Sequence, residues 1–493
     1  MAFIDSTVVN VALPAIQTDF RATVVDVQWL VESYGLFLGA LILVGGSLGD
    51  VFGRRLIFLA GVAIFAVASA GCGAASNIAQ LIVARSVQGV GAALLVPGSL
   101  AIISTSFDSK SRGQAIGTWS GFTAITAAIG PVLGGWLVEH ASWRWVFFIN
   151  FPLATAVIAI SIWHIPESRS ASGDRIDWSG ALLATVGLGA LVAAFIESVN
   201  VGWRNPLVFG SLIVGIGCLT GLLFVEANAR SPMLPLALFG SRNFKGANLV
   251  TLLLYGAIGI FFFLFPLNLI QVQKYPPTGA GAAVLPLILL IFFLSRWSGG
   301  LVAHYGARGP LIIGPLIAAL GFALFALPSV GNSYWTGFFP AVVVLGFGMA
   351  ITVAPLTTVV MNSVNQDRVG AASGINNAVA RVAGVLAIAV LGIVMVKAFG
   401  FRLNHNLSDS LPPSVMRELQ AEETKLGDLQ APPDLDPGMK AAVQASIDDA
   451  FVFGFRIVMW ICAALSLAGA AVAWLLIGGQ VQLTGSDAVH NPT

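Results

Sequence analysis

Long apolar runs constrain this chain more than any other feature of its sequence. Short segments rich in glycine and arginine separate them, and most hold about the 20 residues that a helix needs to cross about 30 Å of hydrocarbon. Backbone polar groups inside a bilayer must bond to one another, which only helices and closed barrels achieve. Charged residues make up 10% of the chain, against about 25% in soluble domains. The sequence therefore predicts an all-α polytopic membrane protein.

Breaks in hydropathy predict fourteen membrane-spanning helices. Their approximate limits are 1–17, 28–47, 56–75, 79–105, 113–138, 145–164, 178–198, 206–226, 246–270, 281–302, 309–328, 335–360, 371–398 and 451–478. The first run is short for a bilayer, and it lacks the basic start of a signal peptide. We therefore expect the authentic first helix to begin upstream of Met1.

The basic residues predict that both termini lie in the cytoplasm, because short cytoplasmic loops carry an excess of Lys and Arg. In this orientation the short outside loops hold four basic residues: Arg21, Arg144, Arg204 and Lys274. The inside loops hold eleven: Arg54, Arg55, Lys110, Arg112, Arg169, Arg175, Arg230, Arg242, Lys245, Arg308 and Arg368. The long loop 399–450 is then outside, and its proline pairs and polar content predict a partly ordered or flexible excursion.

The spans divide into two bundles joined by a linking pair. We predict a six-helix bundle over residues 1–164, a linker with two extra helices over 165–245, a second six-helix bundle over 246–478 that includes the external loop, and a cytoplasmic tail over 479–493.

A weak internal echo agrees with two repeated halves. The segment 45–55 is echoed by the segment 297–308, with Ala303 in the place of Asp50. Repeated halves are expected in secondary transporters, whose substrate site lies near the midplane between them. Glycine-rich loop ends are common, however, so chance is the alternative explanation of the echo.

Several classes of function are excluded by what the sequence lacks. The net charge of +1 gives no reason to expect a nucleic-acid partner, and the three cysteines fall in apolar runs without metal-ligand spacing. No phosphate-binding loop of the form G-x-x-x-x-G-K-[ST] occurs. No catalytic constellation of His, Ser or Cys converges either. We therefore expect no enzyme activity, no metal and no cofactor, so that any work must draw on a gradient or a partner.

Five ordered motifs resemble those of the major facilitator superfamily, and in particular its fourteen-span drug–proton antiporters (EmrB/QacA type). Segment 46–55 has the pattern G-x-L-x-D-x-x-G-R-R of motif A, between two apolar runs. The others are segment 4–14, similar to the first-helix motif of these antiporters, 85–93, similar to motif B, 130–135, similar to motif C, and 143–152, similar to their sixth-span entry.

This resemblance implies the major facilitator fold and proton-coupled multidrug efflux across the cytoplasmic (inner) membrane by alternating access. The implied partners are protons, the bilayer and small drug-like substrates. These substrates are lipophilic, and they include cationic compounds. A periplasmic adaptor and an outer-membrane channel are further partners to be considered. Two alternatives stay open: a dedicated exporter of a single metabolite or siderophore, and a transporter-like sensor that moves no substrate.

Three charged residues inside apolar runs are the first candidates for proton coupling or substrate binding. Asp5, Glu32 and Arg85 each carry a charge that is costly in a membrane unless it faces the bundle interior. Asp5 could bind and release protons, and the motif B residue Arg85 is tied to coupling in the family. The alternatives are a surface position for Asp5, an interfacial one for Glu32 and a structural bond from Arg85 to a backbone carbonyl.

A second set of candidates lies in the predicted span 371–398. Arg381 falls about ten residues into that apolar run, and Asn376 and Asn377 precede it on the same helix, where they could bind polar substrate or neighbouring helices. An aromatic wall for lipophilic cations could also come from Tyr255, Phe261 to Phe263, Phe265 and Trp119. Such residues could equally pack or face lipid.

The residues of motif A predict a conformational latch away from the substrate. These residues are Gly46, Asp50, Gly53, Arg54 and Arg55. Gly53 permits a turn closed to other residues, and Asp50 can accept bonds from an arginine or a helix N-terminus. We expect the latch to hold one half against the other. Simple positive-inside topology explains the arginines, but neither the aspartate nor the glycines.

The residues of motif C predict a close-packed, bendable fifth span at the interface between the halves. Gly130, Gly134 and Gly135 leave one face with almost no side chain, and Pro131 removes a backbone donor. Ordinary tight packing would give the same contact without motion.

Overall fold

The computed structural model describes residues 1–106, 122, 126, 129–169, 177–229, 232, 234–364, 369–408, 411–433 and 435–478. Over these residues the protein is helical and has no strand, and twelve of its helices are long and apolar enough to cross a membrane. The prediction of an all-α membrane protein is confirmed. The first predicted span, a helix over Ala2–Phe20 (α1), is not among the twelve, and predicted span 113–138 is only partly described. The count of fourteen therefore stays a prediction.

The N-terminal helices pack around α4. This helix, Ile78–Ser106, contacts α2 (Val24–Phe52) and α3 (Arg54–Ala74), and α3 contacts α7 (Asn150–His164), which follows the short α6 (Trp145–Phe148). Gly91 and Gly61 bring α4 and α3 together, because a Cβ on Gly91 would lie 2.6 Å from the backbone nitrogen of Phe65 and 3.0 Å from the carbonyl oxygen of Gly61. The absence of side chains thus sets this helix spacing.

The C-terminal helices enclose a core rich in phenylalanine. They are α10 (Arg242–Leu267) with its continuation η2 (Asn268–Val272), α11 (Pro277–Ala282), α12 (Leu285–Tyr305), α13 (Arg308–Phe325), η3 (Tyr334–Phe338), α14 (Phe339–Asn362), α15 (Val369–Leu407) and α17 (Pro437–Leu476). The rings of Phe261, Phe265, Phe322, Phe325 and Phe338 contact one another with centroids 4.7 to 6.1 Å apart. Aromatic packing of this kind joins α10, α13 and η3.

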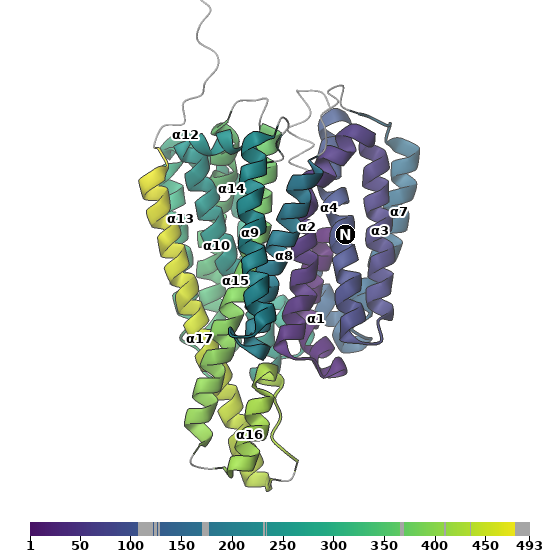
Figure 1. The fold of residues 1–493 in the computed structure, drawn as a ribbon. Coiled ribbons are helices and arrows are strands. Elements are labelled where there is room, and N and C mark those ends of the chain that lie inside the picture. Colours follow the sequence, from purple (N-terminus) through teal and green to yellow (C-terminus); the bar gives the residue numbers. More distant parts are fainter. Residues whose placement is uncertain are drawn as a thin grey trace, which may run out of the picture.

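Two further helices lie beside the seam between these groups. Helix α8 (Trp178–Val201) packs against both α2 and α15, and α9 (Pro206–Asn228) packs on α8. Most large apolar side chains of α9 are exposed, as a lipid-facing helix requires. The short η1 (Leu236–Gly240) then leads into α10. Figure 1 shows α8 and α9 in front of the seam between the purple and green helices.

The predicted loop 399–450 is helical over much of its length and projects from one end of the bundle (Figure 1). We call residues 399–450 the insert and that end of the protein the insert end. Helices α15 and α17 have 39 and 40 residues, about 60 Å each at 1.5 Å per residue, which is about twice the hydrocarbon thickness. Between them lie α16 (Pro413–Ala421) and η5 (Glu423–Asp428).

Two prolines of the insert stand at the first positions of its α-helices. Pro413 occupies the first turn of α16, where a missing N–H costs nothing, and Pro437 does the same for α17 behind the N-cap Asp436. Arg402 of α15 binds Asp449 of α17 at 2.8 Å and ties the two extensions together. The described part of the insert is therefore largely helical, which agrees with the first of the two expected alternatives, a partly ordered excursion.

One arginine in each group of helices binds the end of the last helix of that group. Arg55 donates from Nη1 to the carbonyl oxygen of Ile165, just after α7, at 2.8 Å. Arg308 donates from Nη2 to the carbonyl oxygen of Trp474, near the end of α17, at 2.5 Å. These two residues occupy the same place in the sequence echo, so the echo corresponds to a shared contact in space. The domain boundaries themselves stay a prediction.

We expect Gly91→Leu to destabilise the folded protein by about 1–3 kcal/mol, since a side chain there overpacks the contact between α3 and α4. Thermal unfolding of the purified protein in detergent measures the effect. Gly217→Leu is the matched control, because nothing lies within 4 Å of a Cβ at Gly217. Equal melting temperatures for the two variants would contradict this account of the packing.

Candidate functional site

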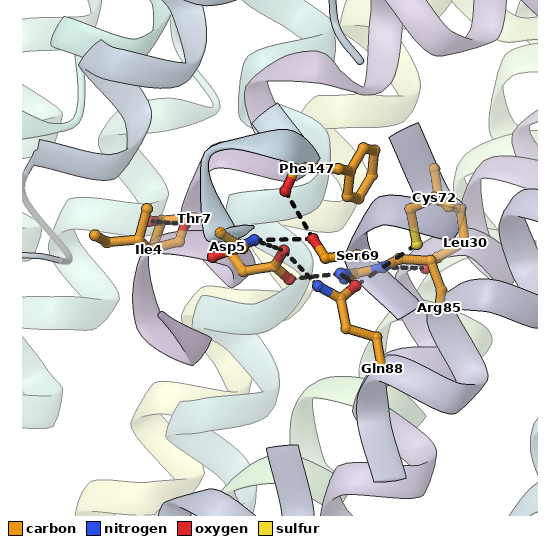
Figure 2. Close-up of polar contacts among 10 residues, drawn as sticks. Ile4, Asp5, Thr7, Leu30, Ser69, Cys72, Arg85, Gln88 and Phe147 are labelled. Carbon is orange, nitrogen blue, oxygen red and sulfur yellow. Dashed lines mark hydrogen bonds and ion pairs between the residues drawn. The ribbon is translucent and has the colours of Figure 1, made fainter. Parts of the chain in front are cut away.

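A buried ion pair lies at the centre of the N-terminal helices (Figure 2). Nη1 of Arg85 on α4 lies 2.5 Å from Oδ2 of Asp5 on α1, and both side chains are almost fully buried. Oδ1 of Asp5 accepts hydrogen bonds from Gln88 at 2.8 Å and Asn150 at 3.0 Å. The aspartate is therefore held by three donors from α4 and α7.

The guanidinium of Arg85 has partners beyond the aspartate. Its Nε donates to the carbonyl oxygen of Leu30 on α2 at 3.4 Å, and Nη1 also donates to Oε1 of Gln88 at 2.8 Å. Its central carbon lies 4.3 Å from the centroid of the Tyr34 ring, which adds a cation–π contact. These bonds place a satisfied, neutral pair in the interior of the bundle.

Ser69 extends the cluster to α3. Its hydroxyl accepts from Asn150 at 3.1 Å and donates to the carbonyl oxygen of Phe147 at 2.8 Å. With this link α1, α2, α3, α4 and α7 all contribute to one polar network. Hydrogen bonds between helices in a low-dielectric interior fix the relative positions of those helices. One acceptor of the network, Oδ1 of Asn150, has no hydrogen-bond partner among the described residues.

A cavity of about 250 Å³ lies next to the ion pair, between the two groups of helices. We call it the central cavity. Arg85 lines it from α4, and Glu32 and Tyr34 line it from α2, while α10 and α15 close the opposite side. Ser6, Thr7 and Asn10 add a polar edge from α1. The pair thus meets a space that both halves of the protein share.

Glu32 is the least satisfied charged group of the central cavity. Its side chain is fully buried, and neither carboxyl oxygen has a hydrogen-bond partner among the described residues. Burying a carboxylate without partners is costly. Glu32 therefore needs a proton or a cation from the cavity to offset its desolvation.

The structure brings four of the six predicted coupling residues together. Arg85, Glu32 and Arg381 line the central cavity, and Asp5 binds Arg85. Asp5 lies in the bundle interior rather than at the surface, which was the alternative. Arg381 reaches the cavity from α15, where its Cβ would lie 3.3 Å from a Cβ on Gly39 of α2. That spacing marks a close approach of the two halves.

The two asparagines do not line the central cavity. Asn376 donates to Thr251 at 2.7 Å and to Asn248 at 3.2 Å, so it joins α15 to α10. Asn377 is exposed and donates to the carbonyl oxygen of Ser373, one turn earlier. Asn376 therefore has one of the two predicted uses, a bond to a neighbouring helix, whereas the bond shown for Asn377 is to the backbone of its own helix.

Part of the predicted aromatic wall lines the cavity. Tyr255, Phe262 and Phe263 line it from α10. Phe261 and Phe265 belong to the aromatic core instead. Trp119 lies outside the described residues.

The motif A residues form a compact loop at the end of α2. Arg54 binds Asp50 at 2.7 Å, and Gly53 has a φ of 123°, a conformation that favours glycine. Glu167, which follows α7, accepts hydrogen bonds from the backbone nitrogens of Arg55 at 3.0 Å and Leu56 at 3.1 Å, and so caps α3. A Cβ on Gly46 would meet Pro97 at an ordinary contact distance. The contacts shown lie within the N-terminal helices and the segment after α7, so the role as a latch between halves stays a prediction.

The motif C glycines lie where a helical segment, 129–140, meets two neighbours. A Cβ on Gly130 or Gly134 would overlap Thr7 or Val8 of α1. A Cβ on Gly135 would overlap the backbone of Pro277 and Thr278 at the start of α11.

Motif C therefore touches both halves of the protein. In return, a Cβ on Gly281 of α11 would overlap the carbonyl oxygen of Pro131. The contact across the halves is thus made backbone against backbone, in the place where sequence reasoning expected an interface. Whether this interface moves stays a prediction.

Sequence reasoning missed the neutral members of the polar network. Gln88 and Asn150 stand inside the motifs at 85–93 and 143–152, yet no role was assigned to them, and Ser69 and Tyr34 were not singled out. The available signal was a polar residue in an apolar run. No group of His, Cys, Asp or Glu in the described part of the chain could hold a metal ion.

Residues 1–388 match the family described as the Major Facilitator Superfamily. The chain is 31% identical to the multidrug resistance protein Stp of Mycobacterium tuberculosis, over 99% of this chain and 91% of that protein. It is 32% identical to the tetracenomycin C resistance and export protein of Streptomyces glaucescens (96% and 88% covered) and 35% identical to the puromycin resistance protein pur8 of Streptomyces alboniger (80% and 79%).

Solved structures share the fold. A bacterial homolog of the human lysosomal transporter Spinster, in an inward-facing and occupied conformation, aligns with a TM-score of 0.64 and 19% identity, over 99% of this chain and 96% of that one. An auto-inhibited peptide transporter of the POT family aligns with a TM-score of 0.63 and 12% identity, over 100% and 97%.

We expect Arg85→Met to destabilise the protein by about 3 kcal/mol or more, because it leaves the Asp5 carboxylate buried without its cation. Adding Asp5→Asn should restore much of this loss, since the double variant buries no charge at the pair. Thermal unfolding and yield of folded protein in the membrane fraction measure both. A double variant no more stable than Arg85→Met alone would show that the pair does not act as a unit.

Proposed function

The chain belongs to the major facilitator superfamily, and from this premise we propose that it exports drug-like compounds across the cytoplasmic membrane in exchange for protons. Its relatives are named for resistance to antibiotics or for their export, which supports drug efflux as the function. We propose that it acts as a carrier without catalytic activity. Both termini would lie in the cytoplasm, as the loop arginines indicate, and the insert would then face outside.

The observation that carries the proposal is the carboxyl group of Glu32 in the central cavity, beside the pair of Asp5 and Arg85. Its oxygens have no hydrogen-bond partner in the described part of the chain. A carboxyl group in this position can exchange one compensating partner for another. A proton offsets its charge when the substrate is absent, and a cationic group of the substrate offsets it when the proton leaves. This competition couples the two flows in opposite directions.

Asp5 and Arg85 have a different part in this scheme. Because Arg85 both binds Asp5 and lines the cavity, a charge that arrives in the cavity acts on the pair directly. Protonation of Asp5 would release the guanidinium toward the cavity and weaken the bonds that hold α1 to α4. The pair can thereby couple a change of charge in the cavity to the packing of α1 against α4.

The cavity lining favours lipophilic substrates. Tyr255, Phe262 and Phe263 offer aromatic faces, and Glu32 favours a positive charge. Arg381 on the opposite wall opposes a second positive charge and suits an acceptor group. We therefore propose compounds with an aromatic body and one amine, and puromycin meets this description.

Alternating access requires contacts across the halves that can break. At the insert end, Gln17 of α1 donates to the carbonyl oxygen of Lys425 in η5 and accepts from Gln271 of η2, each at 3.0 Å. Thr18 donates to Asp428 at 3.1 Å. We propose that these bonds close the outside of the path and that they break when the halves rock about motif C.

One assay distinguishes multidrug efflux from the two alternatives, which are a dedicated exporter and a sensor without transport. A dedicated exporter would lower the accumulation of one compound in a panel, and a sensor without transport would lower none. Cells that express the chain are compared with and without a proton uncoupler, using tetracenomycin C, puromycin and ethidium. A periplasmic adaptor and an outer-membrane channel remain proposals from the family resemblance.

We expect Glu32→Gln to reduce proton-driven efflux by at least tenfold while the protein stays folded, since the amide keeps the shape but cannot exchange a proton. Drug accumulation in vesicles under an imposed pH gradient measures this. Glu197→Gln is the control, because Glu197 accepts from Trp29 at 2.8 Å and does not line the cavity. Wild-type efflux with an unchanged pH dependence in Glu32→Gln would remove Glu32 from the coupling.

We expect Gly135→Leu to lock the transporter, because its side chain would overlap the backbone at Pro277 and Thr278 in the other half. Thiol labelling of Asn10→Cys, placed in the central cavity, measures the access of a reagent from outside. Labelling should respond to substrate in the parent and not in Gly135→Leu. Trp136→Leu, at a half-exposed neighbouring site, serves as control. Substrate-dependent labelling in Gly135→Leu would contradict rocking at this contact.

A further inference from the structure

A second and larger cavity lies at the insert end of the protein. We call it the insert-end chamber. Its volume is about 690 Å³, which is within the range of about 300–1,000 Å³ usual for small-molecule sites. Helix α1, η2, η5 and the start of α17 all line it. The insert therefore forms one wall of the chamber, and the two halves form the others.

The central cavity and the chamber follow one another along α1. Thr7 lines the central cavity, and Val11, Pro14 and Thr18 line the chamber. Positions 7, 11, 14 and 18 have the spacing of a single helix face. A compound that moves along this face from the central cavity toward the insert end reaches the chamber next.

The helix α10 with its continuation η2 shows the same order on the other half. Phe262 and Phe263 line the central cavity, and Ile270 and Gln271 line the chamber, together with Lys274 just after η2. Two helices, one from each half, thus line the central cavity first and the chamber second along their length. This arrangement indicates two successive binding positions on one transport path.

The chamber offers polar groups that have no partner among the described residues. Gln271 is only 7% exposed, and its Oε1 accepts no hydrogen bond from any described residue. The ammonium of Lys440, on α17, is half-buried and makes no hydrogen bond or ion pair within the described chain. Nearby, partial burial raises the pKa of Asp428. A buried acceptor and a cation without partners fit a ligand that has both a donor and an acceptor or anionic group.

We propose that the insert-end chamber is a second substrate-binding site, which holds a drug-sized amphiphile after it leaves the central cavity and before it reaches the outside. A donor of the compound binds Oε1 of Gln271, an acceptor or anion binds Lys440, and its apolar body lies against Val11, Pro14 and Ala15. This inference rests on the proposed export function. It adds that each chain binds two substrate molecules, one in each cavity.

The test is the number of puromycin molecules bound per chain. The full-length protein is purified into lipid nanodiscs, and equilibrium dialysis with radiolabelled puromycin gives the stoichiometry. Ala441→Trp fills the chamber from α17, and Ala442→Trp, also exposed but on a face that does not line it, is the matched control. Lys440→Gln removes the cation and keeps a polar side chain that is one atom shorter.

Two molecules per chain are expected for the parent and for Ala442→Trp, and one for Ala441→Trp. The site that remains shows that the variant is folded. Lys440→Gln should weaken one of the two sites by about tenfold or more and leave the other unchanged. One molecule per chain in the parent, still bound in Ala441→Trp, would overturn the proposal that the chamber binds substrate. The proposed export function would then still stand. No binding to the parent would contradict both.

Discussion

The charge of Arg85, buried among apolar helices, is the constraint on which the N-terminal half depends. A guanidinium in this environment must be paired, and the pair must be hydrogen-bonded on all sides, or its desolvation exceeds its attraction. Asp5, Gln88 and the carbonyl oxygen of Leu30 meet this requirement from three different helices. The same bonds bring α1 against α4 at the edge of the central cavity. Stability and access to the cavity therefore rest on one set of contacts.

Elsewhere the packing depends on glycines, which have no side chain to hold neighbouring helices apart. Apolar side chains gain little by leaving lipid for protein, so helices in a membrane are held by close contact of their backbones. The contacts at Gly61 and Gly91 within a half, and at Gly135 and Gly281 between halves, follow this rule. Contacts without interlocking side chains have few large groups to rearrange, which suits surfaces that must slide or separate.

The sequence was most informative at charged residues whose burial in an apolar helix costs free energy. Asp5, Glu32 and Arg85 stood out because a charge in an apolar run needs a reason, and the structure gathers them at one place. Neutral polar residues were ambiguous, since an amide in a helix can bond its own backbone, as Asn377 does, or a buried carboxylate, as Asn150 does. Contacts such as that of Gln17 with Lys425 join residues 408 positions apart. No local pattern predicts them, because they depend on how the bundles face each other.

The length of α15 and α17 has a mechanical consequence. Both helices run from the packed bundle to the insert without a break, and the pair of Arg402 with Asp449 joins them there. Two stiff rods clamped together act as a lever. A tilt of about 10° in the membrane would displace a tip about 30 Å away by about 5 Å, given a rise of 1.5 Å per residue. The insert thus amplifies rotations that are small near the membrane midplane, and its tip is the natural position for a spectroscopic label that follows the transport cycle.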